Sequence, residues 1–155
     1  MDGQDVYENG MRLALEQAGR ALAAGEPPFG VVILDAGGAL IAAEYDRVRS
    51  SGDMSAHAEV LAVRAACAVY GPDLSGCVLY TTCEPCPMCY TAAWLARIGT
   101  IVYGTTMADV HALMGAAQRE LQIPAATVNV LNAEPLTLIG GVAAERCLGL
   151  FQPAS

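Results

Sequence analysis

Helix-like and strand-like segments alternate along this chain after one predicted hairpin. Apolar residues at helical spacing predict helices, and short β-rich runs bounded by turn residues predict strands. The predicted segments are helices at 6–24, 56–70, 86–96, 109–121 and 142–151, strands at 29–35, 40–46, 77–81, 100–104 and 127–131, and a polar loop at 47–55. Because strands that alternate with helices build a sheet covered on both faces, we expect an α/β fold, a three-layer α/β/α sandwich with a mixed five-stranded sheet.

The length and composition fit one ordinary globular unit. The chain has 155 residues, of which 54% are hydrophobic and 15% charged, so it can build one core. We therefore expect a single domain over residues 1–155. The apolar segment 60–70 contains Arg64 and is too short to cross a bilayer, and acidic residues stand where a signal peptide carries basic ones. These features predict a cytoplasmic protein without a membrane partner.

The charge balance argues against binding to nucleic acid. Sixteen acidic residues against eight basic ones give a formal net charge of −8, whereas a binder of the phosphate backbone needs a basic surface. All eight basic residues are arginine, so the chain offers no P-loop lysine, Schiff-base lysine or Ser-Lys pair. We therefore expect a small-molecule substrate and no nucleic-acid partner.

Two short motifs supply candidate metal ligands. His57 stands two residues before Glu59, and Cys86 and Cys89 stand three residues apart at a predicted helix start. The helix dipole favours thiolates there, and residues three apart share one helix face. His57, Cys86 and Cys89 would give a catalytic zinc its three protein ligands and leave one position for water. Glu59 would then move protons beside the metal, which predicts a hydrolytic centre with one zinc per chain.

These motifs also allow other interpretations. A Cys-x-x-Cys pair alone can be redox-active, but that chemistry has no use for His57 and Glu59. A structural zinc needs a fourth ligand, for which Cys83 and His111 are the nearest candidates. We expect Cys83 to be a buried thiol and His111 a surface residue. A non-catalytic binding module stabilised by zinc stays as the alternative, and the spare carboxylate of Glu59 argues against it.

Residues 57–59 and 85–89 resemble the His-x-Glu and Pro-Cys-x-x-Cys signature of the cytidine and deoxycytidylate deaminase superfamily. Residues 28–30, 81–85 and 93–97 resemble the branch with guanine deaminases, cytosine deaminases and tRNA adenosine deaminases. The resemblance implies that the three candidate ligands hold zinc, and that the neighbouring glutamate carries a proton from the activated water to the ring and the leaving amine. It also implies a homodimer.

The substrate is ranked from charge and resemblance together. A free base, a free nucleoside and a base flipped out of RNA are deaminated at similar sites, and the net charge disfavours RNA. The string at 81–89 and the overall length most resemble guanine deaminases, which suggests nucleobase salvage. We place guanine first, cytosine second, and another amino-heterocycle such as a triazine or pterin third. Deamination of adenosine in tRNA is the remaining alternative.

Three further residues are candidates for the substrate site. Phe29 and Trp94 can stack on a planar heterocycle, although both also suit core packing. Asp109 is the first residue of the predicted helix after the fourth strand. There it would either lie at the mouth of the site or act as the helix N-cap.

Asp46 is the clearest departure from the resembling branch, in which an asparagine tends to end the second strand. An ionised carboxylate only accepts hydrogen bonds, so Asp46 would favour a ring N–H or an exocyclic amine. This chemistry weakens the case for guanine if the family's asparagine donates to the purine, and it suits cytosine or a more amino-rich ring. In the alternative interpretation, Asp46 pairs with Arg47 or Arg49 at the start of a loop.

Overall fold

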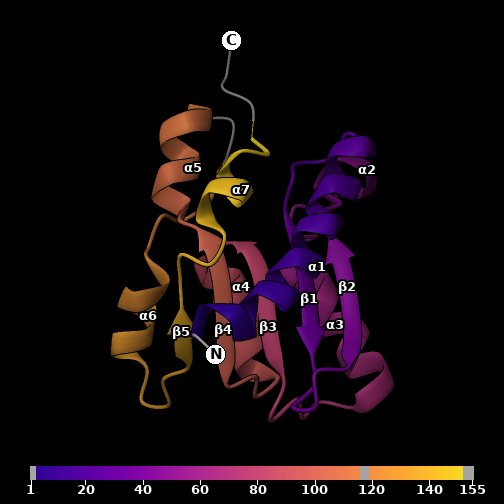
Figure 1. The fold of residues 1–155 in the computed structure, drawn as a ribbon, viewed down its shortest axis with the longest axis vertical. Helices are drawn as coiled ribbons and strands as arrows, with labels where there is room; N and C mark the ends of the chain where they lie inside the picture. The colour runs from indigo at the N-terminus through magenta and orange to yellow at the C-terminus, as the bar shows by residue number, and fades with distance from the viewer. Residues whose placement is uncertain (1–2, 116–118, 152–155) are drawn as a thin grey trace.

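The computed structural model describes residues 3–115 and 119–151 (Figure 1). The helices are α1 (Gly3–Ala23), α2 (Val48–Ser51), α3 (Ala58–Tyr70), α4 (Pro87–Leu95), α5 (Met107–Met114), α6 (Ala125–Leu131) and α7 (Ala144–Leu148). The strands are β1 (Gly30–Leu34), β2 (Leu40–Tyr45), β3 (Val78–Cys83), β4 (Thr100–Thr105) and β5 (Thr137–Ile139). Within these residues, no helix has both the length and the apolar character that crossing a membrane requires.

The strands form one mixed sheet in the order β2-β1-β3-β4-β5. Strand β1 pairs antiparallel with β2 and with β3, whereas β3–β4 and β4–β5 are parallel pairs. Helices α1 and α7 cover one face, and α3 and α4 cover the other (Figure 1). The predicted three-layer α/β/α sandwich with a mixed five-stranded sheet is confirmed.

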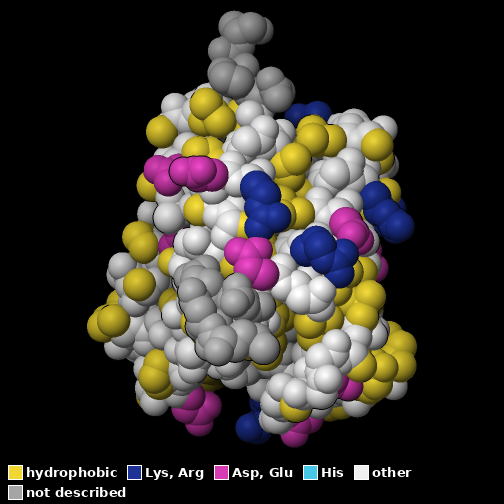
Figure 2. All heavy atoms as spheres, in the orientation of Figure 1, with side chains coloured by type: hydrophobic (Ala, Val, Ile, Leu, Met, Phe, Trp, Pro, Cys, Tyr) yellow, Lys and Arg dark blue, Asp and Glu magenta, His cyan; other side chains and the backbone are white. Residues whose placement is uncertain are grey.

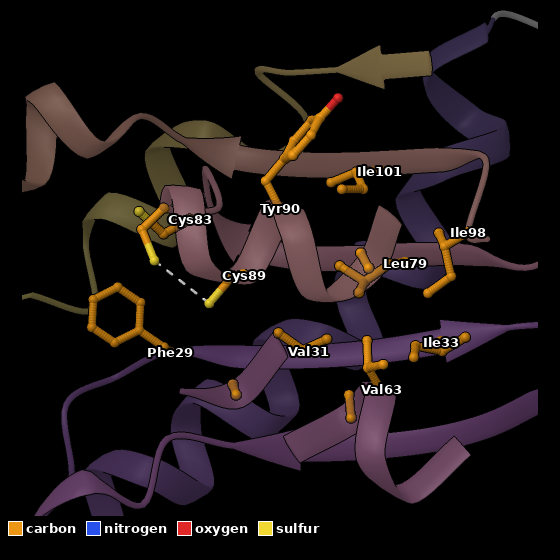
Figure 3. Packing of buried hydrophobic residues seen from close by; sticks show 14 of the residues in the cluster. Phe29, Val31, Ile33, Val63, Leu79, Cys83, Cys89, Tyr90, Ile98 and Ile101 are labelled. Atoms are coloured by element: carbon orange, nitrogen blue, oxygen red, sulfur yellow. Dashed lines mark hydrogen bonds between the residues drawn. The ribbon is translucent and has the colours of Figure 1, made fainter. Parts of the chain in front are cut away.

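Successive side chains of the strands point to opposite faces of the sheet and pack into two separate hydrophobic cores. On the α1 face, Val32 and Leu34 of β1 pack with Tyr80 and Val102. On the opposite face, a larger cluster combines β1 and β3 residues with α3 and α4, and Figure 3 shows Phe29, Cys83 and Cys89 at one end of it. All five residues of β1 are buried because helices cover both sides of this strand.

Helix α1 lies directly on β1 because small residues line the contact. Met11, Ala14, Ala18 and Ala21 are fully buried at helical spacing and form the face towards the sheet. A β-carbon at Gly30 would overlap the backbone oxygen of Ala14 and the backbone nitrogen of Ala18. Glycine at this position therefore permits the close approach of helix and strand.

The C-terminal third differs from the prediction. The segment 127–131, predicted to be a strand, belongs to α6, and the fifth strand is β5 instead. Its threonine and valines favour a strand locally. However, the backbone N–H of Ala125 donates to the carboxylate of Glu84, and this tertiary bond caps a helix.

Two other boundaries also differ. Helix α5 ends at Met114, with Gly115 at a φ of 62°, and residues 119–121 are not helical, although the predicted helix extended to residue 121. Residues 116–118 of that predicted helix lie outside the described residues. The loop predicted at 47–55 contains the short helix α2.

Candidate active site

The three candidate metal ligands come from the starts of two helices that pack together on one face of the sheet. His57 is the N-cap residue of α3, Cys86 is the N-cap residue of α4, and Cys89 lies in the first turn of α4. Proline at position 87 suits the first helical position because its missing N–H would have no partner there. The ligand atoms of the three residues all lie within 4.8 Å of one another.

The distances among these atoms fit a tetrahedral zinc ion. Sγ of Cys86 lies 3.6 Å from Sγ of Cys89, and Nδ1 of His57 lies 3.8 Å and 3.5 Å from these two sulfurs, respectively. Zn–S bonds of ~2.3 Å and Zn–N bonds of ~2.0–2.1 Å at tetrahedral angles give separations of about 3.5–3.8 Å. His57, Cys86 and Cys89 are therefore positioned to bind a metal ion.

The two cysteines differ in their acidity. The hydrogen bond between the sulfurs of Cys86 and Cys89, with a further contribution from His57, lowers the pKa of Cys86 to about 4. The same bond to Cys86, together with burial, raises the pKa of Cys89 well above its ordinary value. Cys86 is thus already a thiolate at neutral pH, and binding of a cation would release the proton of Cys89.

Glu59 lies in the first turn of α3, next to the ligands but outside the ligand group. Its side chain is buried, and burial raises the pKa of its carboxyl group. The hydroxyl of Thr81 on β3 lies 2.7 Å from Oε1 of Glu59, to which it donates, and 2.8 Å from the backbone oxygen of Cys83, a second acceptor for the same hydrogen. A carboxyl group with a raised pKa near a metal site has the properties of a proton carrier. Thr81 was not predicted, although a buried threonine that shares the sheet face of Leu79 and Cys83 is a visible signal.

A small cavity of about 10 Å³, with room for about one water molecule, lies at this cluster. Its lining residues come from several elements and include most of the predicted ones: Phe29, Asp46, His57, Glu59, Cys83, Glu84, Cys86, Cys89 and Glu120.

Asp46 is part of the cavity wall, immediately after β2. Its side chain is 2% exposed, Oδ1 accepts from the backbone N–H of Val48, and burial raises its pKa to about 6. The alternative partners are engaged elsewhere, because Arg47 lies 3.8 Å from Glu44 and Arg49 donates to a backbone carbonyl. The carboxyl group of Asp46 is therefore available to the cavity.

Phe29 and Trp94 have different surroundings. Phe29 lines the cavity, and its ring packs edge-on against Phe151 with the centroids 5.1 Å apart. Trp94 lies on α4 and lines an outer groove instead, where its indole N–H donates to the backbone oxygen of Glu134. The structure thus brings Phe29, but not Trp94, to the candidate site.

Asp109 has neither of its expected roles in the described structure. It is exposed in the first turn of α5 and is not among the residues that line the cavity. The N-cap residue of α5 is Thr106, whose hydroxyl oxygen accepts from the backbone N–H of Asp109. The predicted N-cap was three residues too late because the helix begins at Met107.

Glu120 is a cavity residue that sequence reasoning missed. Its Oε1 lies 3.2 Å from Nε2 of His111, and the exposed fractions of the two side chains are only 8% and 12%. The expectation that His111 is a surface residue is therefore wrong, and burial against Glu120 is the reason. No local motif marks Glu120, which lay at the end of a predicted helix.

Sequence comparison places the chain among known proteins. Residues 4–105 match the family model described as the cytidine and deoxycytidylate deaminase zinc-binding region. The tRNA(Ile)-lysidine synthase of Deinococcus deserti is 44% identical over 112 residues, which make up 72% of this chain and 21% of that protein. The guanine deaminase of Bacillus subtilis is 48% identical over 83 residues, 53% of this chain and 53% of that protein. The chain thus spans about a fifth and about half of the length of these relatives.

Two solved structures share the fold. The structure of NE0047 in complex with 2,6-diaminopurine has a TM-score of 0.82 and 31% identity, and the match covers 92% of this chain and 78% of that one. A tRNA:A34 deaminase, from a study of A-to-I editing at the wobble position of transfer RNA, has a TM-score of 0.77 and 28% identity over 92% of this chain and 99% of that one. Since the family model matches more than half of its residues, this chain belongs to the cytidine and deoxycytidylate deaminase family of zinc-binding proteins.

Proposed function

We propose that the protein is a zinc-dependent hydrolytic deaminase that releases ammonia from a free nucleobase or related heterocycle, with guanine as the first substrate. The observation that carries this proposal is the convergence of His57, Cys86 and Cys89 with the buried carboxyl group of Glu59 at one cavity. A zinc site that only stabilises the fold would gain nothing from that carboxyl group. For this reason, an enzyme is favoured over a binding module.

His57, Cys86 and Cys89 would hold the zinc. When bound, the metal acts as a Lewis acid that lowers the pKa of a water molecule to about 7. Glu59 takes a proton from the attacking water and delivers it to the ring nitrogen next to the amino-bearing carbon. It then takes the second proton from the hydroxyl group added to that carbon and transfers it to the amino group; the C–N bond breaks, ammonia leaves, and a carbonyl group remains on the ring. The Thr81 hydroxyl orients the carboxyl group of Glu59 during these transfers.

The charges around the cavity support a free base. Carboxyl groups of Asp46, Glu59, Glu84 and Glu120 line it. A second hollow shares His57, Cys86 and Glu120 with the cavity and is also lined by Met54, Pro87, Met88, Arg119 and Leu121. Arg119 is the one arginine among the described residues that line either space. The phosphates of a nucleic acid would be repelled there, whereas an uncharged heterocycle would not.

The distribution of charge on the outer surface also argues against binding to nucleic acid. Arg12 and Arg146 form ion pairs with Glu16 and Glu8. On the face drawn in Figure 2, basic side chains stand singly among acidic and apolar ones and form no continuous basic patch over the described residues. A counterion-releasing contact with a phosphate backbone needs several such cations together.

The cavity chemistry also bears on which base is bound. Guanine presents ring N–H and amino groups that can donate hydrogen bonds to a carboxylate, whereas the ring nitrogen N1 of adenosine only accepts hydrogen bonds. Asp46 and Glu120 can therefore accept hydrogen bonds from guanine as well as from cytosine or a more amino-rich ring, and they suit the N1 acceptor of adenosine less well. The match to Bacillus subtilis guanine deaminase and the 2,6-diaminopurine complex of NE0047 point the same way.

Deamination of adenosine in tRNA is the second candidate, favoured by the structural match to a tRNA:A34 deaminase. The deciding experiment is an ammonia-release screen of the purified protein. It would compare guanine, cytosine, adenine, their nucleosides, amino-triazines and pterins with a tRNA anticodon stem-loop assayed for inosine. Ammonia from guanine without inosine supports the proposal, and inosine at enzymatic rates from the stem-loop contradicts it.

We also propose a homodimer formed through an apolar groove between α4 and α6. Tyr90, Trp94, Val128 and Leu131 line this groove, and Leu131 is 82% exposed. A groove of this character on a protein surface is typical of an interaction site. Light scattering on the protein as it elutes from a size-exclusion column would measure its molar mass and so test for the dimer. A cytoplasmic location and a role in nucleobase salvage complete the proposal, since none of the six cysteines forms a disulfide in the described structure, as a reducing compartment would require.

A further inference from the structure

Glu84 stands between β3 and the candidate zinc ligand Cys86, and the reaction described above gives it no role. We propose that Glu84 is a positioning residue, whose carboxylate holds Glu120 at the cavity by anchoring the first residues of both α5 and α6. The inference rests on the proposed function, because it takes Glu120 to be a substrate contact.

The two oxygens of Glu84 bind two different helix starts. Its side chain is 8% exposed. Oε1 accepts from the backbone N–H of Met107 at 3.0 Å, and Oε2 accepts from the backbone N–H of Ala125 at 2.8 Å. These are the first residues of α5 and α6, whose N–H groups have no acceptor within their own helices. One carboxylate therefore fixes where both helices begin.

Glu120 is connected to both of these anchored points. It precedes Ala125 by five residues, so it lies on the chain that enters α6. It also contacts His111, which follows Met107 by four residues and therefore lies one turn into α5. Both connections lead back to the carboxylate of Glu84.

Glu120 needs such support because its location is electrostatically unfavourable. Its side chain is 8% exposed and faces a cavity that also contains the carboxyl groups of Asp46 and Glu59. Burial disfavours the ionised form of Glu120 and raises its pKa, so its carboxylate is more stable in solvent than at the cavity. We expect Glu120 to leave the cavity when the anchors of its chain segment are weakened.

Replacing Glu84 by glutamine tests the carboxylate with almost no change in shape. A carboxylate accepts at both oxygens, whereas an amide accepts at one end and donates at the other. Glu84→Gln therefore leaves the N–H of Met107 or Ala125 facing another donor. The competing explanation is that Glu84 merely supports the metal loop, and in that case the variant would lose zinc.

Glu26 provides a matched control. It is also a buried glutamate whose two oxygens accept backbone N–H groups at a helix start, here those of Arg49 and Ser50 in α2. Glu26→Gln breaks the same kind of cap, but at a helix that does not carry Glu120. A general loss of stability would appear equally in both variants.

Ala125→Pro attacks the same link from the other side. It replaces the N–H that binds Oε2 of Glu84 by the proline ring carbon, which also pushes that oxygen aside, so the contact is broken while the carboxylate keeps its charge. Proline is tolerated at the first position of a helix, and Pro124 already has the extended backbone that a following proline requires. This variant tests the inference even if Glu84→Gln does not fold.

The experiment is a double-mutant cycle with Glu120→Gln, measured as kcat/KM on the most active base, zinc content, and hydrogen exchange of residues 119–125. We expect Glu120→Gln to lower kcat/KM about 10- to 100-fold in the wild-type background, and less than about 3-fold in the Glu84→Gln or Ala125→Pro background. In the Glu26→Gln background the full effect should remain. Zinc should stay at one per chain. Exchange of the backbone amide hydrogens within residues 119–125 should accelerate in Glu84→Gln and Ala125→Pro but not in Glu26→Gln.

Several outcomes would overturn the inference: a Glu120→Gln effect of the same size in every background, a Glu120→Gln variant as active as wild type, or loss of zinc from Glu84→Gln. Failure of the proposed function is distinguishable, because the wild type would then release no ammonia from any base. The hydrogen-exchange comparison would still test whether Glu84 anchors the segment.

Discussion

The hydroxyl of Thr81 on β3 donates a hydrogen bond of 2.7 Å to the carboxyl group of Glu59 on α3. Both side chains are buried, and this contact joins the central strand of the sheet to the helix that starts at His57. The bond fixes the orientation of the proposed proton carrier relative to the metal ligands. A carrier held in this way needs little reorganisation during proton transfer.

The first prediction concerns this bond. Thr81→Val keeps the side-chain shape and removes the hydroxyl, so kcat should fall about tenfold to a hundredfold while zinc content stays the same. The matched control is Thr82→Val, since the hydroxyl oxygen of the equally buried Thr82 accepts from the backbone N–H of Gly30 instead. Equal losses of kcat in both variants would show that Thr81 acts only through stability.

Zinc content tests the ligand assignment. Elemental analysis should find about one zinc per chain in the wild type, and His57→Ala, Cys86→Ala and Cys89→Ala should each lose most of it. Cys83→Ala should keep it, because Cys83 lines the cavity but lies outside the group of close ligand atoms. Loss of zinc from Cys83→Ala together with retention in Cys89→Ala would show that the ligands are assigned wrongly.

Asp46→Asn should reorder the substrate preferences. The asparagine adds a donor at the cavity wall, and one mismatched polar contact costs ~1–3 kcal/mol, or about tenfold to a hundredfold in specificity. The ratio of kcat/KM for guanine to that for cytosine should therefore change between the two proteins, with zinc unaffected. An unchanged ratio with both rates near wild type would mean that Asp46 does not contact the ring.

The same substitution should alter the pH dependence of stability. Burial raises the pKa of Asp46 from 3.8 to about 6, so the folded state holds this proton more tightly than the unfolded chain does. The stabilising contribution is present at low pH and is lost as the pH rises through about 6. Between pH 5 and pH 8 the unfolding free energy of the wild type should fall by about 1–2 kcal/mol more than that of Asp46→Asn. The unfolding free energies would be measured by urea unfolding at several pH values. The same change with pH in both proteins would contradict this prediction.

Local sequence signals were sufficient to predict the layered sheet and the three candidate metal ligands that the structure brings together. His57, Cys86 and Cys89 each stand at or within a helix start that proline, spacing and apolar periodicity mark in the sequence. Strands β1 and β2 are short and separated by a glycine-rich turn, so their antiparallel pairing as a hairpin follows from the pattern.

The remaining features depend on contacts between distant segments. Segment 127–131 has strand-forming residues but is helical because Glu84, 41 residues before Ala125, caps it. Glu120 lies at the cavity and contacts His111, and no local sequence pattern predicts this contact. Trp94 faces the outer groove because α4 carries large apolar residues towards both the core and the surface, and helical spacing alone does not decide between them.

The most direct test of the central claim is ammonia release by the wild type and by Glu59→Gln at equal zinc content. The substitution keeps the size of the side chain and its acceptor for Thr81 but cannot carry a proton. With one zinc per chain in both proteins, we predict deamination of guanine by the wild type and a loss of about 10²–10⁴-fold or more in the variant. A Glu59→Gln protein that retains a tenth of the wild-type rate would contradict the role of Glu59 as the proton carrier of this site.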